Sequence, residues 1–441
     1  MAAATKTQNL HAPVLVAGLG LTGWSVVRYL YARGEAMVVT DTRDNPPFLD
    51  QLYASYPEVP FVANLPNNKI KGYREIIASP GLAVAADHAI GDIELFAREA
   101  KAPIIGVTGS NGKSTVTTLV GKMLNGAGYT ALVGGNIGTP ALDLLELPVP
   151  DFYVLELSSF QLETTLSLSP CSAVVLNISE DHMDRYSNLQ EYASTKFRVY
   201  EHANCSVINR DDALVRQYGK KDGGISFGLD QGAKGQFGII EDEGGEYFAV
   251  GQKKLAPITD LTLQGKQNIS NVLAAMALID CAGLELSTPM IEAAMRYQGL
   301  PHRCELVGSW YGVKWINDSK GTNVGATLAA INGAEKPVIL IAGGQGKGAD
   351  FLALKAAVAK SVKAVILIGE DALIIADAIE AGEKAEIAKS LRRAIELAAN
   401  QSEAGDTVLF SPACASFDMF RSYEHRGEVF RRLVKERHDA E

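Results

Sequence analysis

The sequence contains little of what marks secreted, zinc-binding or membrane-spanning proteins. Cysteine is scarce and scattered, at Cys171, Cys205, Cys281, Cys304 and Cys414. None belongs to a C-x-x-C pair, so we expect neither a disulfide framework nor a zinc cluster. No run approaches about 18 uninterrupted apolar residues, and the opening MAAATKTQNLHAP lacks the apolar core of a signal peptide. We therefore expect a cytoplasmic protein of a reducing compartment, without membrane insertion.

An excess of positive charge is also missing. The chain has 41 Lys and Arg against 51 Asp and Glu, which gives a formal net charge of −10. Nucleic-acid-binding proteins usually carry a basic patch, so we expect small-molecule substrates and no nucleic acid. Anionic ligands must then be held by local sites. We expect the protein to be a monomer.

Short β-branched runs, each followed by glycine and a helical pattern, predict an α/β fold with parallel sheets. Three such openings look like the starts of separate units: APVLVAGLG at 12–20, APIIGVTG at 102–109 and PVILIAGG at 337–344. We predict domains at 1–100, 101–299 and 300–441. The first and third are expected to be Rossmann-like, and the second a P-loop ATPase domain with a mostly parallel sheet.

The stretch GVTGSNGKST at 106–115 almost matches the phosphate-loop pattern G-x-x-x-x-G-K-[ST], but Val107 stands where the first glycine belongs. A strand precedes it and a helix follows, so backbone N–H groups would face an anion. Lys113 would reach the β- and γ-phosphates, and Ser114 would bind Mg²⁺. The alternative is a glycine-rich turn with a surface lysine. The nucleotide interpretation predicts an ATP loop at Gly109, Ser110, Asn111, Gly112, Lys113, Ser114 and Thr115.

Acidic residues end two of the following strands. Glu156 closes VLEL, where it could face a cation or simply meet solvent. AVVLNIS leads into EDHMDRY, which places Asp181, His182 and Asp184 at another strand end, the edge where α/β sites form. A lone histidine is usually structural, so a metal or phosphate role is the less expected of the two interpretations of His182.

A second glycine motif lies near the N-terminus. GLGLTG contains Gly18, Gly20 and Gly23 in the spacing G-x-G-x-x-G, and Asp41 ends the next strand about 20 residues on. This fingerprint favours NAD or FAD, but the same turn binds any diphosphate at a helix N-terminus. Asp41, followed by Thr42 and Arg43, could equally serve a uridine diphosphate. One triphosphate and one diphosphate conjugate in the same chain favour a ligase over a motor.

These motifs resemble those of the Mur ligases of peptidoglycan synthesis, and the similarity is continuous from GLGLTG to the last helix. The family's phosphate loop reads TGSNGKST, which accounts for Val107. Further matching stretches are GGNIG at 134–138, LELSSFQLE at 155–163, EDHMDRY at 180–186, QNISN at 267–271, LPHRCE at 300–305, NDSKGTN at 317–323 and SPACASFDMF at 411–420. LELSSFQLE, LPHR and SPACAS point to the branch of the family that adds D-glutamate.

The resemblance implies roles that spacing alone does not. The implied catalytic residues are Lys113, Glu156, His182 and Lys196. The implied ligands of two Mg²⁺ ions are Ser114, Glu156, His182 and a CO₂-derived carbamate on Lys196. The rest of the ATP would meet Asn268, Asn271, Arg303, Asp318 and Lys320. The UDP substrate would meet Thr22, Asp41, Thr42, Arg43, Gly81, Asn136 and Gln161. The amino acid would meet Thr322, Lys347, Ser416 and Phe417.

The implied reaction joins D-glutamate to UDP-N-acetylmuramoyl-L-alanine with ATP, through an acyl phosphate. One departure is Gln345, where relatives are expected to carry an acidic residue. Three alternatives remain: a sibling or folylpolyglutamate-type ligase for another amino acid, an NAD-linked oxidoreductase that uses GLGLTG, and a nucleotide sensor without turnover. The last two leave parts of the motif set unexplained.

Overall fold

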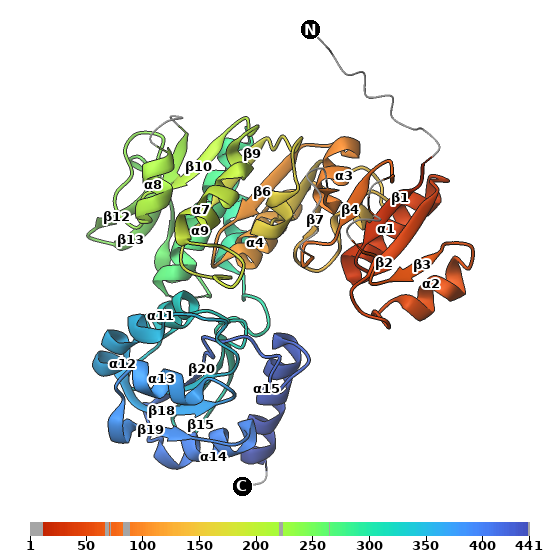
Figure 1. Ribbon diagram of the computed structural model, residues 1–441. Helices are drawn as coiled ribbons and strands as arrows, with labels where there is room; N and C mark the ends of the chain where they lie inside the picture. Colours follow the sequence, from red (N-terminus) through yellow and green to blue (C-terminus); the bar gives the residue numbers. More distant parts are fainter. Residues whose placement is uncertain are drawn as a thin grey trace.

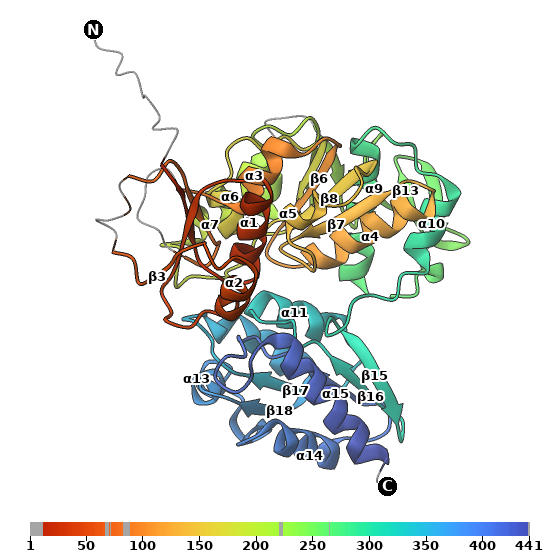
Figure 2. The same ribbon diagram turned by 90° about the vertical axis from the view of Figure 1, so that its right-hand side faces the viewer.

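The computed structural model describes residues 12–66, 70, 72–82, 89–219, 224–263 and 265–439. They form three sheets, each with its own helices (Figure 1). The central sheet lies between the N-terminal domain on one side and the C-terminal domain below it, and Figure 2 shows the same arrangement after a quarter turn. Where one domain ends and the next begins stays a prediction.

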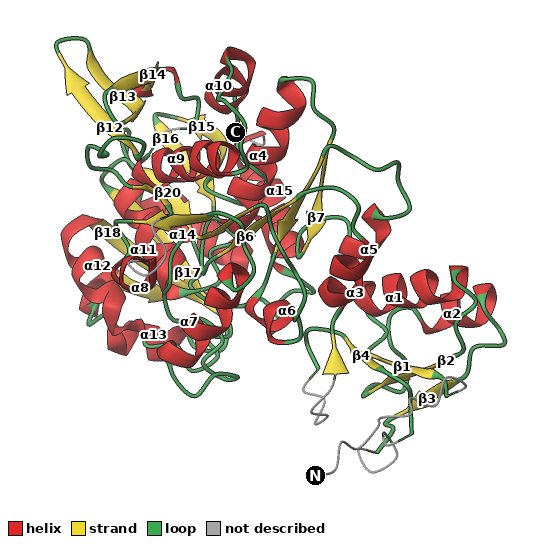
Figure 3. Ribbon diagram, turned by 90° about the horizontal axis from the view of Figure 1, so that it is seen from above, coloured by secondary structure: helices red, strands yellow, loops and turns green. Residues whose placement is uncertain are grey.

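The N-terminal sheet is wholly parallel, with the order β3-β2-β1-β4-β5. Its strands are β1 (Val14–Ala17), β2 (Met37–Asp41), β3 (Phe61–Ala63), β4 (Ile76–Ala78) and β5 (Ala89–Ile90). The associated helices are α1 (Leu21–Ala32), α2 (Leu49–Ser55) and α3 (Asp92–Glu99). The strand order reverses between β1 and β4, and ligands bind open α/β sheets at such a reversal. Seen from above, this domain is set to one side (Figure 3).

The central sheet has nine strands in the order β14-β13-β12-β11-β10-β9-β6-β8-β7. They are β6 (Ile104–Thr108), β7 (Ala131–Gly135), β8 (Phe152–Glu156), β9 (Ser172–Val175), β10 (Ser206–Asn209), β11 (Ile225–Phe227), β12 (Phe237–Asp242), β13 (Gly245–Val250) and β14 (Lys253–Pro257). Among the described pairs of this sheet, only β12–β13 and β13–β14 are antiparallel. The helices are α4 (Lys113–Gly126), α5 (Ala141–Leu144), α6 (Ser159–Glu163), α7 (Leu189–Phe197), α8 (Ala213–Gly219), α9 (Lys266–Cys281) and α10 (Thr288–Met295).

Helices α4 and α9 pack together and against the central sheet. Helix α9 is apolar on most of its surface, and eleven of its 16 residues are buried. A helix that is apolar all round must lie inside the domain rather than on its surface. The burial of α9 therefore fixes its N-terminal end beside that of α4.

The C-terminal sheet has the order β15-β16-β20-β17-β18-β19, parallel except for the β15–β16 hairpin. Its strands are β15 (Glu305–Trp310), β16 (Val313–Asn317), β17 (Val338–Gly343), β18 (Val362–Ile368), β19 (Ala385–Ile387) and β20 (Thr407–Phe410). The helices are α11 (Val324–Gly333), α12 (Lys355–Ser361), α13 (Ala372–Ala378), α14 (Leu391–Gln401) and α15 (Tyr423–Asp439).

One expectation about cysteine is wrong in part. Cys205 and Cys281 form a disulfide between the start of β10 and the end of α9, with their Cα atoms 5.6 Å apart. The two residues are 76 positions apart in the sequence, so only the packing of α9 against β10 brings them together. Cys171, Cys304 and Cys414 are free. Within the described residues, no helix is both long and apolar enough to cross a bilayer.

The third glycine of GLGLTG has a packing role that can be tested. A Cβ at Gly23 would lie 1.7 Å from the carbonyl oxygen of Gly18, whereas a Cβ at Gly81 would meet nothing within 4 Å. Because helix α1 must move to relieve this overlap, we expect Gly23→Ala to lower the free energy of unfolding by about 1–3 kcal/mol or more. Urea denaturation measures this, with Gly81→Ala as the control. Equal stability of the two variants would contradict the prediction.

Candidate active site

Val107 departs from the usual phosphate-loop pattern because it belongs to the strand. It lies fully buried in β6, between Glu156 of β8 and Val174 of β9. The glycine loop (109–112) starts two residues later, with positive φ at Gly109 and Gly112. At Gly109 a Cβ would lie 3.0 Å from the Leu176 side chain. The loop is therefore a shorter variant at the N-terminus of α4, where helix ends favour anions.

The Lys113 side chain folds back over this loop. Its ammonium donates hydrogen bonds to the carbonyl oxygens of Gly109 and Ser110, both at 2.9 Å. Burial lowers the pKa of Lys113, while the carboxylates of Glu156 and Asp181 oppose that shift. The ammonium is thus held in place near the anion-binding end of α4.

Glu156 is buried and fully hydrogen-bonded at the end of β8. One carboxylate oxygen accepts from the Ser114 hydroxyl, and the other accepts from the Asn136 amide at 2.9 Å. Arg303 donates to the same Ser114 oxygen from the C-terminal domain. Burial alone would raise the pKa of Glu156, but the charges of Lys113 and Arg303 and these hydrogen bonds hold it below its ordinary value. The carboxylate is therefore ionised and faces cations.

Lys196 lines the same cavity as Lys113 and Glu156, although the sequence of its helix, α7, is that of a surface helix. The side chain is 1% exposed, and its ammonium lies 4.6 Å from the centre of the Tyr192 ring. No ion pair of Lys196 occurs within the part of the chain that the structure describes. Burial, and then the charge of Lys113, lower its pKa well below the ordinary value. The uncharged amine is thereby favoured.

His182 has a left-handed backbone, with φ of 58°, and its ring packs against Phe160. Its Nε2 atom lies 3.7 Å from Asp181, whose carboxylate accepts from Asn323 at 3.2 Å. Burial lowers the pKa of His182. Asp184, which the sequence places beside Asp181 and His182, is exposed and does not line the cavity that contains Lys113 and Glu156.

These groups line one cavity of about 280 Å³, which we call the catalytic cavity. Its polar lining comes from the central domain and from the C-terminal domain. The central domain contributes Ser110, Asn111, Gly112, Lys113, Asn136, Glu156, Ser158, Ser159, Asp181, His182, Tyr192 and Lys196. The C-terminal domain contributes Arg303, Lys320, Thr322 and Asn323. Within the described residues, no group of three His, Cys, Asp or Glu could alone hold a metal ion.

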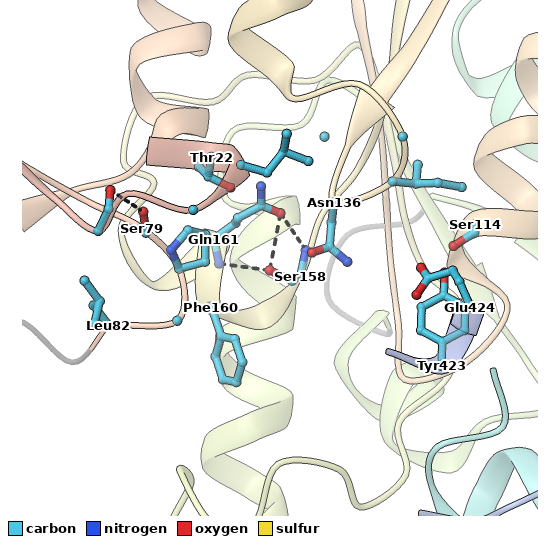
Figure 4. Close-up of a pocket in the computed structure, with 18 of the residues that line it drawn as sticks. Thr22, Ser79, Leu82, Ser114, Asn136, Ser158, Phe160, Gln161, Tyr423 and Glu424 are labelled. Carbon is cyan, nitrogen blue, oxygen red and sulfur yellow. Dashed lines mark hydrogen bonds between the residues drawn. The ribbon is translucent and has the colours of Figure 1, made fainter. Parts of the chain in front are cut away.

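A larger cleft of about 840 Å³ opens toward the N-terminal domain. It contains every predicted contact of the UDP substrate: Thr22, Asp41, Thr42, Arg43, Gly81, Asn136 and Gln161. Ser114 and Lys320 line the same cleft, so all three domains contribute to it. Figure 4 shows Thr22 and Gln161 on one side of this space and Ser114, Tyr423 and Glu424 on the other.

Asp41 is committed to local partners. It accepts from the backbone N–H of Leu19 at 2.7 Å and from two guanidinium nitrogens of Arg43 at 2.8 Å each. Although burial would raise the pKa of Asp41, these hydrogen bonds lower it to about 2. A ribose-binding aspartate needs a free oxygen, whereas here the carboxylate orients Arg43.

Gln161 is fixed in orientation by three contacts. It closes a capping box with Ser158 at the start of α6, in which its Oε1 accepts from the Ser158 backbone at 3.1 Å. Its Nε2 donates to Asp92 at 3.2 Å. Asp92 is buried at the start of α3, and its other carboxylate oxygen has no hydrogen-bond partner in the structure. Asp92 at the start of α3 therefore holds the Nε2 atom of Gln161, and Ser158 holds its Oε1 atom.

A third, smaller cavity of about 70 Å³ lies behind the glycine loop. Its lining includes the remaining predicted ATP contacts Asn268, Asn271, Arg303, Asp318 and Lys320, together with Thr115. Burial raises the pKa of Asp318 to about 6 and lowers the pKa of Lys320 to about 8.

The predicted amino-acid contacts are only partly brought together. Thr322 lines the catalytic cavity, while Lys347, Ser416 and Phe417 lie outside its lining. Phe417 is 66% exposed. The loops that carry Lys347 and Ser416 are nevertheless joined, because Gln345 and Ala415 exchange two backbone hydrogen bonds.

Sequence reasoning missed several residues of these cavities. Tyr423 and Glu424, from the first turn of α15, line the large cleft, and the Lys320 ammonium lies 3.7 Å from the centre of the Tyr423 ring. Asn323 caps α11 and also donates to Asn111 and Asp181 across the domain boundary. For Asn323 a signal existed, because an asparagine before a helical pattern marks an N-cap. Nothing local distinguished Tyr423.

The fold and these cavities define a three-domain α/β protein with mostly parallel sheets and a glycine loop at the domain junction. Three family models match the chain: the Mur ligase MurD-like N-terminal domain at 12–106, the Mur ligase middle domain at 107–279 and the Mur ligase glutamate ligase domain at 302–414.

Full-length relatives agree with these models. A UDP-N-acetylmuramoylalanine–D-glutamate ligase from Marinobacter nauticus is 49% identical over 96% of this chain and 97% of its own length. One with the same name from Legionella pneumophila is 44% identical over 96% and 99%. The chain belongs to the Mur ligase family.

Solved structures support the fold at lower identity. The UDP-N-acetylmuramate-alanine ligase of Thermotoga maritima matches 98% of this chain and 100% of its own, with a TM-score of 0.60 and 18% identity. A pseudomurein peptide ligase type C from Methanothermus fervidus matches 96% and 99%, with a TM-score of 0.62 and 18% identity.

The burial of Asp92 predicts a pH-dependent stability. Burial raises the pKa of Asp92 to about 6 from its ordinary 3.8, so the folded state holds this proton more tightly than the unfolded state. The contribution of Asp92 to wild-type stability must therefore fall as pH rises from about 4 to about 6. Asp92→Asn removes this loss, so we expect the variant to gain about 3 kcal/mol relative to wild type across that range and a constant difference above it.

Urea denaturation at intervals of pH measures this difference. Asp50→Asn, at an exposed position on α2, is the control and should show no such trend. A difference between Asp92→Asn and wild type that does not change with pH would refute the prediction.

Proposed function

We propose that the protein is an ATP-dependent ligase that adds D-glutamate to UDP-N-acetylmuramoyl-L-alanine in the cytoplasmic synthesis of peptidoglycan precursors. The observation that carries the proposal is one cleft, lined at one end by the glycine turn at Gly18 and at the other by Ser114 and Lys320. A substrate held by a diphosphate at the first would extend toward a triphosphate at the second. The names of relatives that are 44–49% identical agree with this reading.

Each domain would take one substrate. The parallel N-terminal domain, Rossmann-like in strand order, would bind the UDP, and the central P-loop ATPase domain would bind ATP. The Rossmann-like C-terminal domain would bind D-glutamate. The boundaries would be 1–100, 101–299 and 300–441. The protein would act as a monomer in the cytoplasm.

ATP would lie across the N-terminus of α4. The loop residues Gly109 to Thr115 would surround its phosphates, with the Lys113 ammonium against the β- and γ-phosphates. Arg303 and Lys320 would add positive charge from the C-terminal domain. Asn268, Asn271 and Asp318, which line the small cavity, would meet the nucleoside.

The residues around Glu156 fit a divalent cation. Ser114 and Glu156 offer a hydroxyl and an ionised carboxylate, the oxygen ligands that Mg²⁺ prefers. A cationic group, the guanidinium of Arg303, already lies against the Ser114 oxygen. We therefore propose that Ser114 and Glu156 would hold one Mg²⁺ and that His182 and modified Lys196 would hold a second. Bound Mg²⁺ would neutralise charge on the transferred phosphoryl group.

The surroundings of Lys196 likewise fit the formation of a carbamate. Its amine is buried without an ion-pair partner in the described residues, and burial favours the uncharged form that can attack CO₂. The product is an anion, which a cavity with this many cations would accept.

The UDP part of the substrate would meet Thr22, Thr42, Arg43 and Gly81, with Asp41 orienting Arg43. Asn136 and Gln161 lie between that end and Glu156, in position for the muramoyl–alanine part. Thr322, Lys347, Ser416 and Phe417 would surround D-glutamate, whose carboxylates need a cation and hydrogen-bond donors. Because Lys347, Ser416 and Phe417 lie outside the catalytic cavity, this subsite would form fully only as the domains close.

Direct amide formation from a carboxylate is unfavourable in water. The γ-phosphoryl group would first pass to the alanine carboxylate, and the amine of D-glutamate would then displace phosphate. Lys113, Arg303 and Lys320 would stabilise the negative charge that moves in both steps. His182, whose pKa is lowered by burial, would accept the amine proton if its ring is not committed to metal.

Phosphate release tests the proposal. With ATP, Mg²⁺ and UDP-N-acetylmuramoyl-L-alanine, release is expected with D-glutamate and not with other amino acids. Lys113→Ala should lower the rate by on the order of 10²–10³, because it removes a fixed charge from the transferred group. Lys122→Ala, exposed on the same helix, is the control. Release with another amino acid would move the protein to a sibling activity, and NADH binding without release would refute the ligase.

The lowered pKa of Lys320 predicts the alkaline limb of the pH profile. Its pKa of about 8 means that Lys320 is charged below pH 8 and loses its charge above it. If the charge binds ATP, kcat/KM for ATP should fall about tenfold per pH unit above that value. Lys320→Arg stays charged at higher pH, so its plateau should extend beyond about pH 9. An unchanged limb in Lys320→Arg would assign the ionisation to another group.

A further inference from the structure

A guanidinium is buried in the C-terminal domain, beneath the predicted amino-acid subsite. Arg426, in the first turns of α15, is 1% exposed. Burial lowers its pKa only to about 10, so it is charged at neutral pH. An unpaired buried charge is costly unless its hydrogen-bonding groups are satisfied. The contacts of Arg426 therefore need an explanation.

The hydrogen bonds that this guanidinium donates go to neutral oxygen atoms. Its Nε donates to the Ser319 hydroxyl at 3.0 Å, and Nη2 donates to the Ser319 carbonyl at 2.8 Å. Nη2 also donates to the carbonyl of Cys414, and Nη1 to that of Ala415, both at 3.1 Å. Each of its three nitrogen atoms is used, in directions that diverge as a planar fork requires.

The nearest carboxylates are committed elsewhere. Asp418 accepts from the backbone N–H of Glu370 at 3.0 Å. Asp318 accepts from the Ser411 hydroxyl at 2.7 Å and from the Cys304 backbone at 3.1 Å. Within the described residues, Arg426 thus forms no ion pair, and its hydrogen bonds hold two stretches of backbone rather than neutralise a charge.

Those two stretches belong to two of the three loops that follow the adjacent strands β16, β20 and β17. The loops are 318–323 after β16, 411–422 after β20 and 344–350 after β17, and these strands are neighbours in the sheet. Arg426 joins the first two directly. It reaches the third through Ala415, whose carbonyl also accepts from Gln345 at 3.1 Å. A Cβ at Gly344 would lie 2.4 Å from that same carbonyl oxygen, so the three loops are closely packed.

Each loop carries one of the residues that we assign to D-glutamate: Thr322 in the first, Ser416 in the second and Lys347 in the third. We propose that Arg426 is the positioning residue that keeps these three loops in register and thereby sets the affinity for the amino acid. The proposal rests on the function proposed above. It requires Arg426 to act through the loop backbones, without touching a substrate.

Lysine is the informative replacement. It keeps the positive charge, but a single ammonium cannot reach four oxygen atoms placed in the plane of a guanidinium. We expect Arg426→Lys to raise KM for D-glutamate on the order of tens of fold, since hydrogen bonds to a charged group are lost. KM for the UDP substrate should stay within about threefold of wild type, because its assigned contacts lie in the N-terminal and central domains. KM for ATP does not serve as a control, because Asp318 and Lys320 share the first loop with Ser319.

Two further variants keep the test decisive. Ser319→Ala removes one hydrogen bond of Arg426, and with it the bond from the Ser319 hydroxyl to the Tyr423 carbonyl, but it keeps the guanidinium. It should therefore raise KM for D-glutamate by a smaller factor. Arg432→Lys, an exposed position on the same helix, is the matched control and should leave all three KM values unchanged. If circular dichroism shows that Arg426→Lys does not fold, the KM of Ser319→Ala for D-glutamate decides whether the proposal holds.

The proposal would be overturned if a folded variant of Arg426 or Ser319 kept the wild-type KM for D-glutamate. It would also be overturned if KM for the UDP substrate rose as much as KM for D-glutamate, since that is what general destabilisation produces. Failure of the proposed function is distinguishable, because the wild-type protein would then release no phosphate with D-glutamate. If the wild type accepts another amino acid, the KM comparison is made with that amino acid, and the same outcomes apply.

Discussion

Repulsion among buried cations is the constraint on which the rest of the site depends. Lys113, Lys196, Lys320 and Arg303 lie around one cavity. Beyond the effect of burial, the charge of Arg303 lowers the pKa of Lys113 and Lys320, and the charge of Lys113 lowers the pKa of Lys196 and Lys320. Glu156 offsets part of this charge, but it faces several cations at once. The chain as a whole is negative, at −10, so the excess is strictly local. A site of this kind is stabilised by a polyanion, which explains both why a triphosphate fits and how CO₂ could convert Lys196 into a further anion.

The fold produces this concentration of charge by geometry. In the N-terminal domain the predicted substrate residues lie at or after the ends of β1, β2 and β4, and in the central domain most of them lie at or after the ends of β6, β7, β8 and β9. In the C-terminal domain they follow β16, β17 and β20. The carboxyl ends of parallel strands share one edge of a sheet, so each domain presents its loops on one side. The contacts of Arg303 with Ser114 and of Asn323 with Asp181 bring the central and C-terminal edges together. Chemistry that needs groups from both domains therefore depends on how closely they approach.

The sequence predicted the parts that depend on local pattern. Strand–glycine–helix transitions located the glycine loop and the GLGLTG turn, and acidic residues at strand ends located Glu156 and Asp181. Local pattern could not show that Lys196 is buried, because the sequence of α7 is that of an ordinary surface helix; the family resemblance supplied that residue. Arg426 and the Cys205–Cys281 disulfide were missed for a related reason. Ser319, one partner of Arg426, lies 107 positions away, and the two cysteines lie 76 positions apart, so only the packing of α15 and of α9 creates these contacts.

Backbone strain is concentrated in the loops that surround the catalytic cavity and the predicted amino-acid subsite. Of the eight described non-glycine residues with positive φ, five lie in them: His182, His302, Cys304, Lys347 and Ala413. Each such residue costs about 1–3 kcal/mol and persists only where its surroundings hold it. His302 is held by the amide of Asn317 at 2.9 Å, which also donates to the carbonyl of Gly427 in α15. Helix α15 thus stabilises one side of the site through Gly427 and the other through Arg426. Helix α15 lines the large cleft only with its first turn. Its contacts through Gly427 and Arg426 nevertheless support loops whose backbone conformations are unfavourable for the residues that adopt them.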